Sequence, residues 1–204
     1  HKMKTHKQLL KWKLCKAYFD IIDSSLKEEV TFEELIFVSK IKPKDAEKII
    51  SKNNNNYNIF FLKILLSKLD TQTLSEFKID ISEDTISSTY EKILEGLTLR
   101  LESFLPYRKS FKILSQNQNI KVLNFLKLLE SNCSFMSDLL DIIEGGQNQN
   151  IKMLKSLALN IVFVRAMNVF LKENDHNLDS TIRNLDKFLR DFEDVGHFIG
   201  VIKN

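Results

Sequence analysis

Apolar residues recur every three or four positions along almost the whole chain, which is the spacing of one face of an α-helix. Leu10, Leu14 and Tyr18 follow this spacing and predict a helix over residues 7–24. Further helices are expected at residues 32–39, at 43–51, from the polar stretch 53–56 to about residue 77, and at 83–105, 106–115, 120–143, 151–172 and 178–196.

Residues that interrupt helices are scarce. The 204 residues include five glycines and two prolines, whereas a β-rich fold of this size would need more turn residues. We therefore expect an all-α fold of about nine helices, in which three short helices lead, one long helix connects and five form a bundle. A smaller N-terminal domain is expected at residues 1–56 and a helical domain at 57–204.

Residues 31–52 predict two short helices joined by a tight turn. Thr31 and Glu34 have the spacing of a capping box, and Pro43 suits the first turn of the second helix. Two short helices with lysines on the outer face of the second are typical of a helix-turn-helix. The residues expected on the inner faces are Phe32, Leu35, Ile36, Ala46, Ile49 and Ile50.

Positive charge is concentrated at the front of the chain. The net charge is +3 overall, +4 over residues 1–58 and −1 over residues 59–204. A basic head on a neutral body suits a nucleic-acid-binding domain attached to a regulatory one. A solvated, lysine-rich terminus would give the same counts.

The sequence predicts no enzyme, metal site or cofactor. The four histidines lie at the termini or in turns, and no nucleophile–base pair, glycine-rich phosphate loop or metal-ligand spacing occurs. Cys15 and Cys133 are expected to be buried free thiols, which indicates a reducing cytoplasm. The longest apolar run, residues 157–164, is interrupted by Asn160, so no transmembrane segment is expected.

Two stretches carry a resemblance to a known family. Residues 90–114 contain the ending Leu-Pro-Tyr-Arg at 105–108, and residues 175–188 form an acidic turn followed by a helix. Both resemble the alphaproteobacterial branch of the TetR family of bacterial transcriptional regulators. Relatives of the lipid-binding accessory protein of ubiquinone biosynthesis share the C-terminal pattern.

The TetR resemblance implies that the second and third helices form the DNA-binding element. The family has Gly and Val in the turn and Tyr on the third helix, and this chain has Lys40, Ile41 and Glu47 at those positions. The family tyrosine contacts a phosphate, which a glutamate would repel. No arginine precedes Arg100, so bidentate reading of guanine by arginine is absent from this head.

Lysines would then make the contacts with DNA, mainly by neutralising phosphates without sequence preference. A solvated lysine face is the alternative interpretation. The candidate DNA-binding residues are Lys40, Lys42, Lys44, Lys48 and Lys52.

Large, soft side chains in the C-terminal bundle are candidates for the lining of a pocket for an apolar or lipid-like ligand. A packed core without a ligand is the alternative. Arg165 could anchor an anionic group of such a ligand, although an arginine in an apolar helix more often forms an ion pair. The candidates are Leu97, Phe104, Phe125, Phe135, Met136, Phe163, Met167 and Arg165.

The last two helices carry apolar residues on more than one face, so both faces must be buried. A symmetric homodimer through these helices would achieve this, and a larger core within one chain is the alternative. The candidate interface residues are Leu154, Leu157, Ile161, Val164, Leu185, Phe188 and Phe192.

Two functional hypotheses follow. The first is a TetR-like DNA-binding regulator, homodimeric, with an apolar effector pocket that controls the spacing of its two heads. The second is a TetR-fold protein that does not recognise DNA and instead binds a lipid, a quinone-like molecule or a protein partner. Glu47 and the altered turn are the features that separate these hypotheses.

Overall fold

The computed structural model describes the backbone of residues 2–27, 29–50, 57–116, 121–146, 148–173 and 177–198. Side chains are described over the same ranges except at residues 2–5, 121–127 and 193–198.

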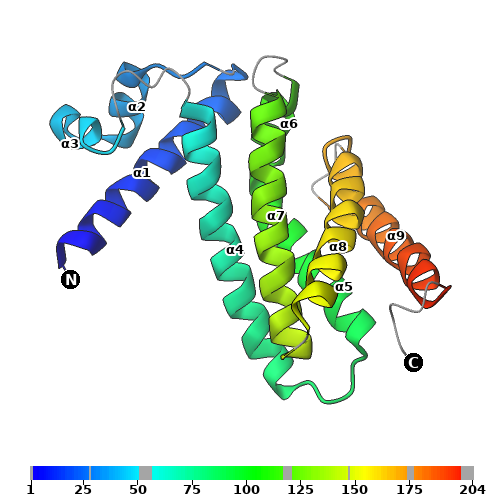
Figure 1. Ribbon diagram of the computed structural model, residues 1–204. Coiled ribbons are helices and arrows are strands. Elements are labelled where there is room, and N and C mark those ends of the chain that lie inside the picture. The colour runs from blue at the N-terminus through cyan, green and yellow to red at the C-terminus, as the bar shows by residue number, and fades with distance from the viewer. Residues whose placement is uncertain are drawn as a thin grey trace. The chain divides into compact units, whose positions relative to one another are not determined.

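All regular secondary structure in these ranges is helical, so the predicted all-α class is confirmed (Figure 1). The described residues form nine α-helices, close to the predicted organisation, and one 3-10 helix. They are α1 (Lys2–Ser25), α2 (Phe32–Ser39), α3 (Pro43–Glu47), α4 (Tyr57–Glu83), α5 (Thr89–Phe104), η1 (Leu105–Tyr107), α6 (Arg108–Gln116), α7 (Lys121–Glu144), α8 (Gln149–Phe170) and α9 (Asp179–Phe198).

Capping boxes begin two of the helices. At α2, the Glu34 N–H donates to Thr31 Oγ1 at 3.2 Å, and the Thr31 N–H donates to the Glu34 carboxylate at 2.9 Å. This confirms the capping box predicted from the sequence. Ser88 and Glu91 make the same reciprocal pair at α5, at 3.3 and 2.7 Å. Each box satisfies backbone donors that the first helical turn leaves without an intrahelical partner.

The predicted end of one helix at about residue 77 and the predicted start of the next at residue 83 are both wrong. Helix α4 continues to Glu83, and α5 begins at Thr89 instead of Glu83. The chain turns at Asp84, whose Oδ1 accepts the N–H groups of Ile86 at 2.9 Å and Ser87 at 3.0 Å. These bonds stabilise a turn directly after α4.

The chain divides into two compact units, which are described separately. Unit one comprises residues 1–68 and 107–128. Its centre is aromatic: the Tyr18 ring stacks on Phe61 at 4.8 Å and meets Phe19 edge-on at 5.2 Å. Helix α1 packs against α2 and α6. Other fully or nearly fully buried side chains of this unit are Leu14, Ile22, Leu35, Ala46, Ile50 and Leu114.

Unit two comprises residues 69–106 and 129–204. Helix α8 packs along α9, and α5 also contacts α9 (Figure 1). The core of this unit includes Leu97, Leu101, Phe104, Phe135, Met136, Leu139, Phe163, Ala166 and Leu185.

Helices α4 and α7 each contribute residues to both units. Packing therefore groups residues 57–68 with the N-terminal helices, although the sequence placed a domain boundary between residues 56 and 57. The two units are defined by contacts alone, so a functional division at residue 56 stays a prediction.

Candidate functional site

The turn between α2 and α3 alternates buried and exposed residues. Ser39 and Ile41 are buried, whereas Lys40 and Lys42 are exposed. Lys40 adopts the left-handed region at φ +52°, and its N–H donates to the Ile36 carbonyl at 2.9 Å. Residues other than glycine rarely adopt this backbone conformation, because their Cβ atom makes it unfavourable. The turn therefore has the backbone shape expected where the resemblance implied glycine, with a lysine in its place.

Helix α3 is shorter than predicted. It ends at Glu47 instead of continuing to about residue 51, and the N–H groups of Ile49 and Ile50 both donate to the Ala46 carbonyl, at 2.9 and 2.8 Å. Ala46 and Ile50 are buried and hold this segment against the rest of unit one. A recognition helix of this length presents little more than one turn to a groove.

The candidate DNA-binding lysines share one exposed segment. Lys40, Lys42, Lys44 and Lys48 are all exposed on the turn and on α3, whereas Lys52 lies outside the described residues. Lys48 forms an exposed ion pair with Asp45 at 3.2 Å, a contact that contributes little to stability in water. Four of the five predicted residues are thus exposed within residues 40–48, and we call these four lysines the α2–α3 lysine surface.

Most of the candidate ligand-lining residues form a packed core in unit two. Leu97, Phe104, Phe135, Met136 and Phe163 have almost no exposed surface, and Met167 is also buried. The side chain of Phe125 lies outside the described residues. This arrangement matches the alternative interpretation of a core without a ligand.

Arg100 is fully buried within this core. Its Nε and Nη2 donate to the two carboxylate oxygens of Asp70 at 2.8 and 2.9 Å. Its guanidinium also lies 4.3 Å from the ring centre of Phe135 and 4.7 Å from that of Phe163. Ion pairing and cation–π attraction offset part of the cost of taking this charge out of water.

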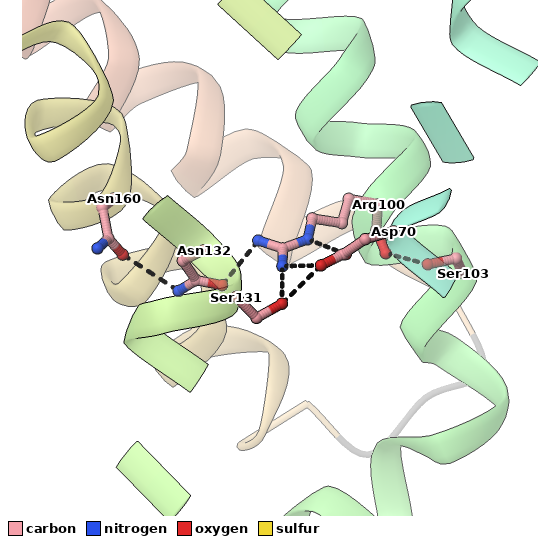
Figure 2. Close-up of polar contacts among 6 residues, drawn as sticks. All are labelled: Asp70, Arg100, Ser103, Ser131, Asn132 and Asn160. Atoms are coloured by element: carbon pink, nitrogen blue, oxygen red, sulfur yellow. Dashed lines mark hydrogen bonds and ion pairs between the residues drawn. The ribbon is translucent and has the colours of Figure 1, made fainter. Parts of the chain in front are cut away.

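The Arg100 pair extends into a chain of polar side chains (Figure 2). Arg100 Nη1 donates to Asn132 Oδ1 at 2.7 Å, and Asn132 Nδ2 donates to Asn160 Oδ1 at 3.1 Å. Ser131 Oγ accepts from Arg100 at 3.1 Å and donates to Asp70 at 2.6 Å. The chain links α4, α5, α7 and α8 within unit two, and we call it the Arg100 network.

Arg165 is exposed on α8, and its guanidinium lies 5.7 Å from the centre of the Phe188 ring. It therefore lies outside the buried cluster of the other candidate ligand residues. The buried ion pair that is common for an arginine in an apolar helix occurs at Arg100.

A separate cavity of about 110 Å³ lies among α5, α7, α8 and α9. A cavity of about 150 Å³ holds benzene, so this one admits only a very small molecule without rearrangement. Lys155 and Glu144, which form an ion pair at 2.9 Å, contribute to its lining. None of the candidate ligand residues lines it; its apolar walls are Tyr90, Ile93, Leu140, Leu159, Leu189 and Phe192.

The candidate interface residues separate into two groups. On α8, Leu154, Leu157 and Ile161 are 54%, 55% and 56% exposed and form one stripe, which we call the α8 stripe. Val164 is half-buried nearby. On α9, Leu185 is fully buried, and Phe188 and Phe192 are half-buried. The α8 residues leave an uncovered apolar face, whereas the α9 residues partly fill the interior of their own unit.

The two cysteines differ in their exposure to solvent. Cys15 is buried and donates to the Phe61 carbonyl at 3.4 Å, and burial raises the pKa of its thiol. Cys133 is exposed, so its predicted burial is wrong. It directly follows the fully buried Asn132 on α7, and successive helical residues point in different directions.

No group of three or more His, Cys, Asp or Glu residues in the part of the chain that the structure describes could hold a metal ion. Helix α8 alone there is long and apolar enough to cross a membrane, and half of its most apolar stretch is buried inside the protein. Core helices of soluble proteins share these properties, so the absence of a transmembrane segment stays a prediction.

No protein-family model matches the chain, and no curated protein matches its sequence.

Proposed function

We propose that the protein is a TetR-like transcriptional regulator that binds duplex DNA as a homodimer. The observation that carries this proposal is the α2–α3 lysine surface. Its left-handed turn joins two short helices, and four lysines on that turn and on α3 face solvent. Buried Ser39 and Ile41 anchor the turn that carries the exposed residues Lys40 and Lys42.

The contacts available to this surface are with phosphates. The ammonium group of lysine neutralises a phosphate as a point charge. It lacks the two parallel N–H donors with which arginine recognises guanine. Each neutralised phosphate adds about 0.9 to the slope of log affinity against log salt on duplex DNA. The proposed function therefore includes strongly salt-dependent binding with little sequence preference from direct base contacts.

The test is fluorescence anisotropy of a labelled duplex across a salt series from about 50 to 200 mM, the range in which phosphate contacts dominate. The double variant Lys42→Ala/Lys44→Ala is expected to reduce the magnitude of the salt slope by about 2. A matched variant, Lys172→Ala/Lys187→Ala, removes two exposed lysines from unit two and is expected to keep the slope. Absence of binding at the lowest salt would overturn the proposal.

A second candidate function is a TetR-fold protein that has lost DNA recognition and binds an apolar molecule or a protein. The five-residue α3 favours it, because so short a helix with Glu47 at its end offers few contacts to a groove. Native mass spectrometry of the purified protein tests the ligand-binding form. A co-purified lipid or quinone-like mass together with no DNA binding would support this candidate, and a clean apo mass would count against a tightly bound ligand.

A further inference from the structure

The aromatic side chain of Phe37 is largely exposed to solvent. It is 83% exposed on α2, and its neighbour Val38 is 40% exposed. The inward face of α2 is formed by Leu35 and Ser39, which are both buried. Successive helical residues are about 100° apart, so Phe37 lies on the side of the helix away from that face and Val38 lies at its edge. Nothing in the packing of α2 requires a large aromatic side chain at this position.

Three cations follow Phe37 closely along the chain. Lys40 is three residues further on, and Lys42 and Lys44 follow at intervals of two residues, all exposed. The turn that carries them is fixed by the Lys40 N–H bond to the Ile36 carbonyl and by the Ile41 N–H bond to Ser39 Oγ at 3.4 Å. These bonds order the backbone that follows α2, so Phe37 and the lysines are carried on one short, fixed segment of the chain, which reduces the entropic cost of binding.

Three partners are possible: single-stranded nucleic acid, a nucleic-acid duplex and a membrane surface. The free energies of their contacts with Phe37 and the apolar area that each partner needs distinguish them. Stacking of an unpaired base on an aromatic ring contributes about 1–3 kcal/mol, whereas in a duplex the ring must first unstack a base step at a cost of a few kcal/mol. Anchoring to a membrane surface needs a broad apolar face of a helix, and this site offers only Phe37 and Val38. An aromatic ring beside lysines matches the common design of sites for single-stranded nucleic acid.

We propose that the α2–α3 lysine surface binds single-stranded nucleic acid, with one unpaired base stacked on Phe37 and adjacent phosphates contacted by Lys40, Lys42 and Lys44. The inference rests on the proposed function because both use the same lysines, and it adds an aromatic contact that duplex binding does not need. It assigns to Phe37 a role in distinguishing unpaired from paired bases.

The experiment compares a labelled oligothymidylate, a labelled oligouridylate and a duplex by fluorescence anisotropy at one salt concentration. Both single strands are expected to bind more tightly than the duplex, and their ranking distinguishes DNA from RNA as the source of the unpaired base. Phe37→Ala is expected to weaken single-strand binding by about 5- to 100-fold, the equivalent of one stacked base, and to leave duplex binding within about twofold. Phe37→Tyr is expected to retain affinity, and Ile79→Ala, which truncates an exposed apolar residue of unit two, should have no effect.

A spectroscopic variant reports stacking directly. Trp12 is the single tryptophan of the chain, so Phe37→Trp in a Trp12→Phe background places the indole signal at the proposed site. Addition of oligothymidylate is expected to quench this fluorescence, and circular dichroism checks that the variant is folded.

Several results would overturn the inference. They are tighter binding of the duplex than of either single strand, an unchanged affinity in Phe37→Ala, and an unquenched indole in a folded variant that binds. Sedimentation with phosphatidylglycerol vesicles in the absence of oligonucleotide binding would overturn it in favour of a membrane surface. Lysine-dependent duplex binding without single-strand binding removes this inference alone, whereas failure with all three probes removes the proposed function as well.

Discussion

At the scale of single residues, Arg100 and Asp70 form an ion pair in unit two that is almost entirely removed from water. Arg100 has no exposed surface, and 13% of the Asp70 side chain is exposed. Burial lowers the pKa of Arg100, while the Asp70 carboxylate acts in the opposite direction. The two partners differ in their access to solvent. If the ion pair is lost, water can reach the Asp70 carboxylate but cannot reach the Arg100 guanidinium.

This difference in solvent access predicts which single substitution destabilises the protein more. Asp70→Asn leaves a buried cation without its counter-ion and is expected to lower the free energy of unfolding by about 3–5 kcal/mol. Arg100→Met fills the space among the phenylalanines with an adaptable apolar side chain and is expected to cost clearly less. Urea unfolding of both variants measures the difference. Equal losses would show that solvent access to Asp70 does not matter.

A second residue-level prediction concerns acid stability. Hydrogen bonds from the Ser87 side chain and from the N–H groups of Ser87 and Ile86 lower the pKa of Asp84 from 3.8 to about 2. Because the folded-state pKa is lower than the unfolded one, this carboxylate contributes stability above about pH 4 that is lost as the pH falls towards 2. Thermal melting of Asp84→Asn, which keeps the acceptor oxygen but not the charge, should show a shallower decline over this range. An identical pH profile would contradict the prediction.

Residue roles could be predicted from the sequence only in part. An ion pair was the favoured interpretation of an arginine in an apolar helix, and Arg100 has one. Its partner Asp70 could not be chosen, because one sequence does not reveal which helices are neighbours. Asn160 interrupts the longest apolar run of the sequence, but nothing in the sequence indicates that it bonds to Asn132.

At the scale of helices, α5 and α7 approach each other closely at Gly96. A Cβ atom built at this position would lie 2.5 Å from Leu139 Cδ1, and Leu139 is itself fully buried. Gly96 is part of a regular helix, so its role is to leave space and not to provide a special backbone conformation. The absence of a side chain permits the close packing.

Gly96→Ala should therefore destabilise the protein although alanine favours helices. The propensity gain is about 1 kcal/mol, and overpacking a core costs about 1–3 kcal/mol. The companion substitution Leu139→Ala removes the clashing methyl groups, so the double variant is expected to lose less than the sum of the two single losses. Chemical unfolding of the three variants measures the coupling. Strict additivity would show that the two side chains do not meet.

Element boundaries depended on which local signals were recognised. The Thr31–Glu34 capping box was found, and α2 begins where it predicts. Ser88 and Glu91 have the same spacing and begin α5 at Thr89, whereas the helix was predicted to begin at residue 83. The early end of α3 had no comparable signal, because its apolar residues continue at helical spacing to Ile50.

At the scale of the whole molecule, the α8 stripe is the feature that a single chain leaves unexplained. Leu154, Leu157 and Ile161 lie on one face of α8 and are each more than half exposed, and Ile151 and Met153 add exposed apolar surface nearby. The sequence indicated that α8 has two apolar faces, and one of them is covered within the chain. What covers the other cannot be read from one sequence, because a partner copy and a larger core give the same pattern.

A symmetric dimer through α8 predicts that one charge in the stripe separates the copies. Leu157→Glu is expected to sediment as a monomer where the unchanged protein sediments as a dimer, because a two-fold axis would repeat the substituted charge across the interface. Ile79→Glu places the same charge on another exposed apolar residue and is the matched control. Analytical ultracentrifugation measures the masses, and a monomeric unchanged protein or a dimeric Leu157→Glu would remove this interface.

The dimer prediction also bears on DNA binding, because two linked lysine surfaces bind one duplex more tightly than either surface alone. Linking converts the second contact into an intramolecular step, which can raise the overall affinity about 100-fold or more when both surfaces reach the duplex. Leu157→Glu should therefore weaken duplex binding although it changes no residue of the α2–α3 lysine surface, whereas Ile79→Glu should not. If the monomeric variant binds duplex as tightly as the dimer, each copy acts independently and the homodimeric part of the proposed function is wrong.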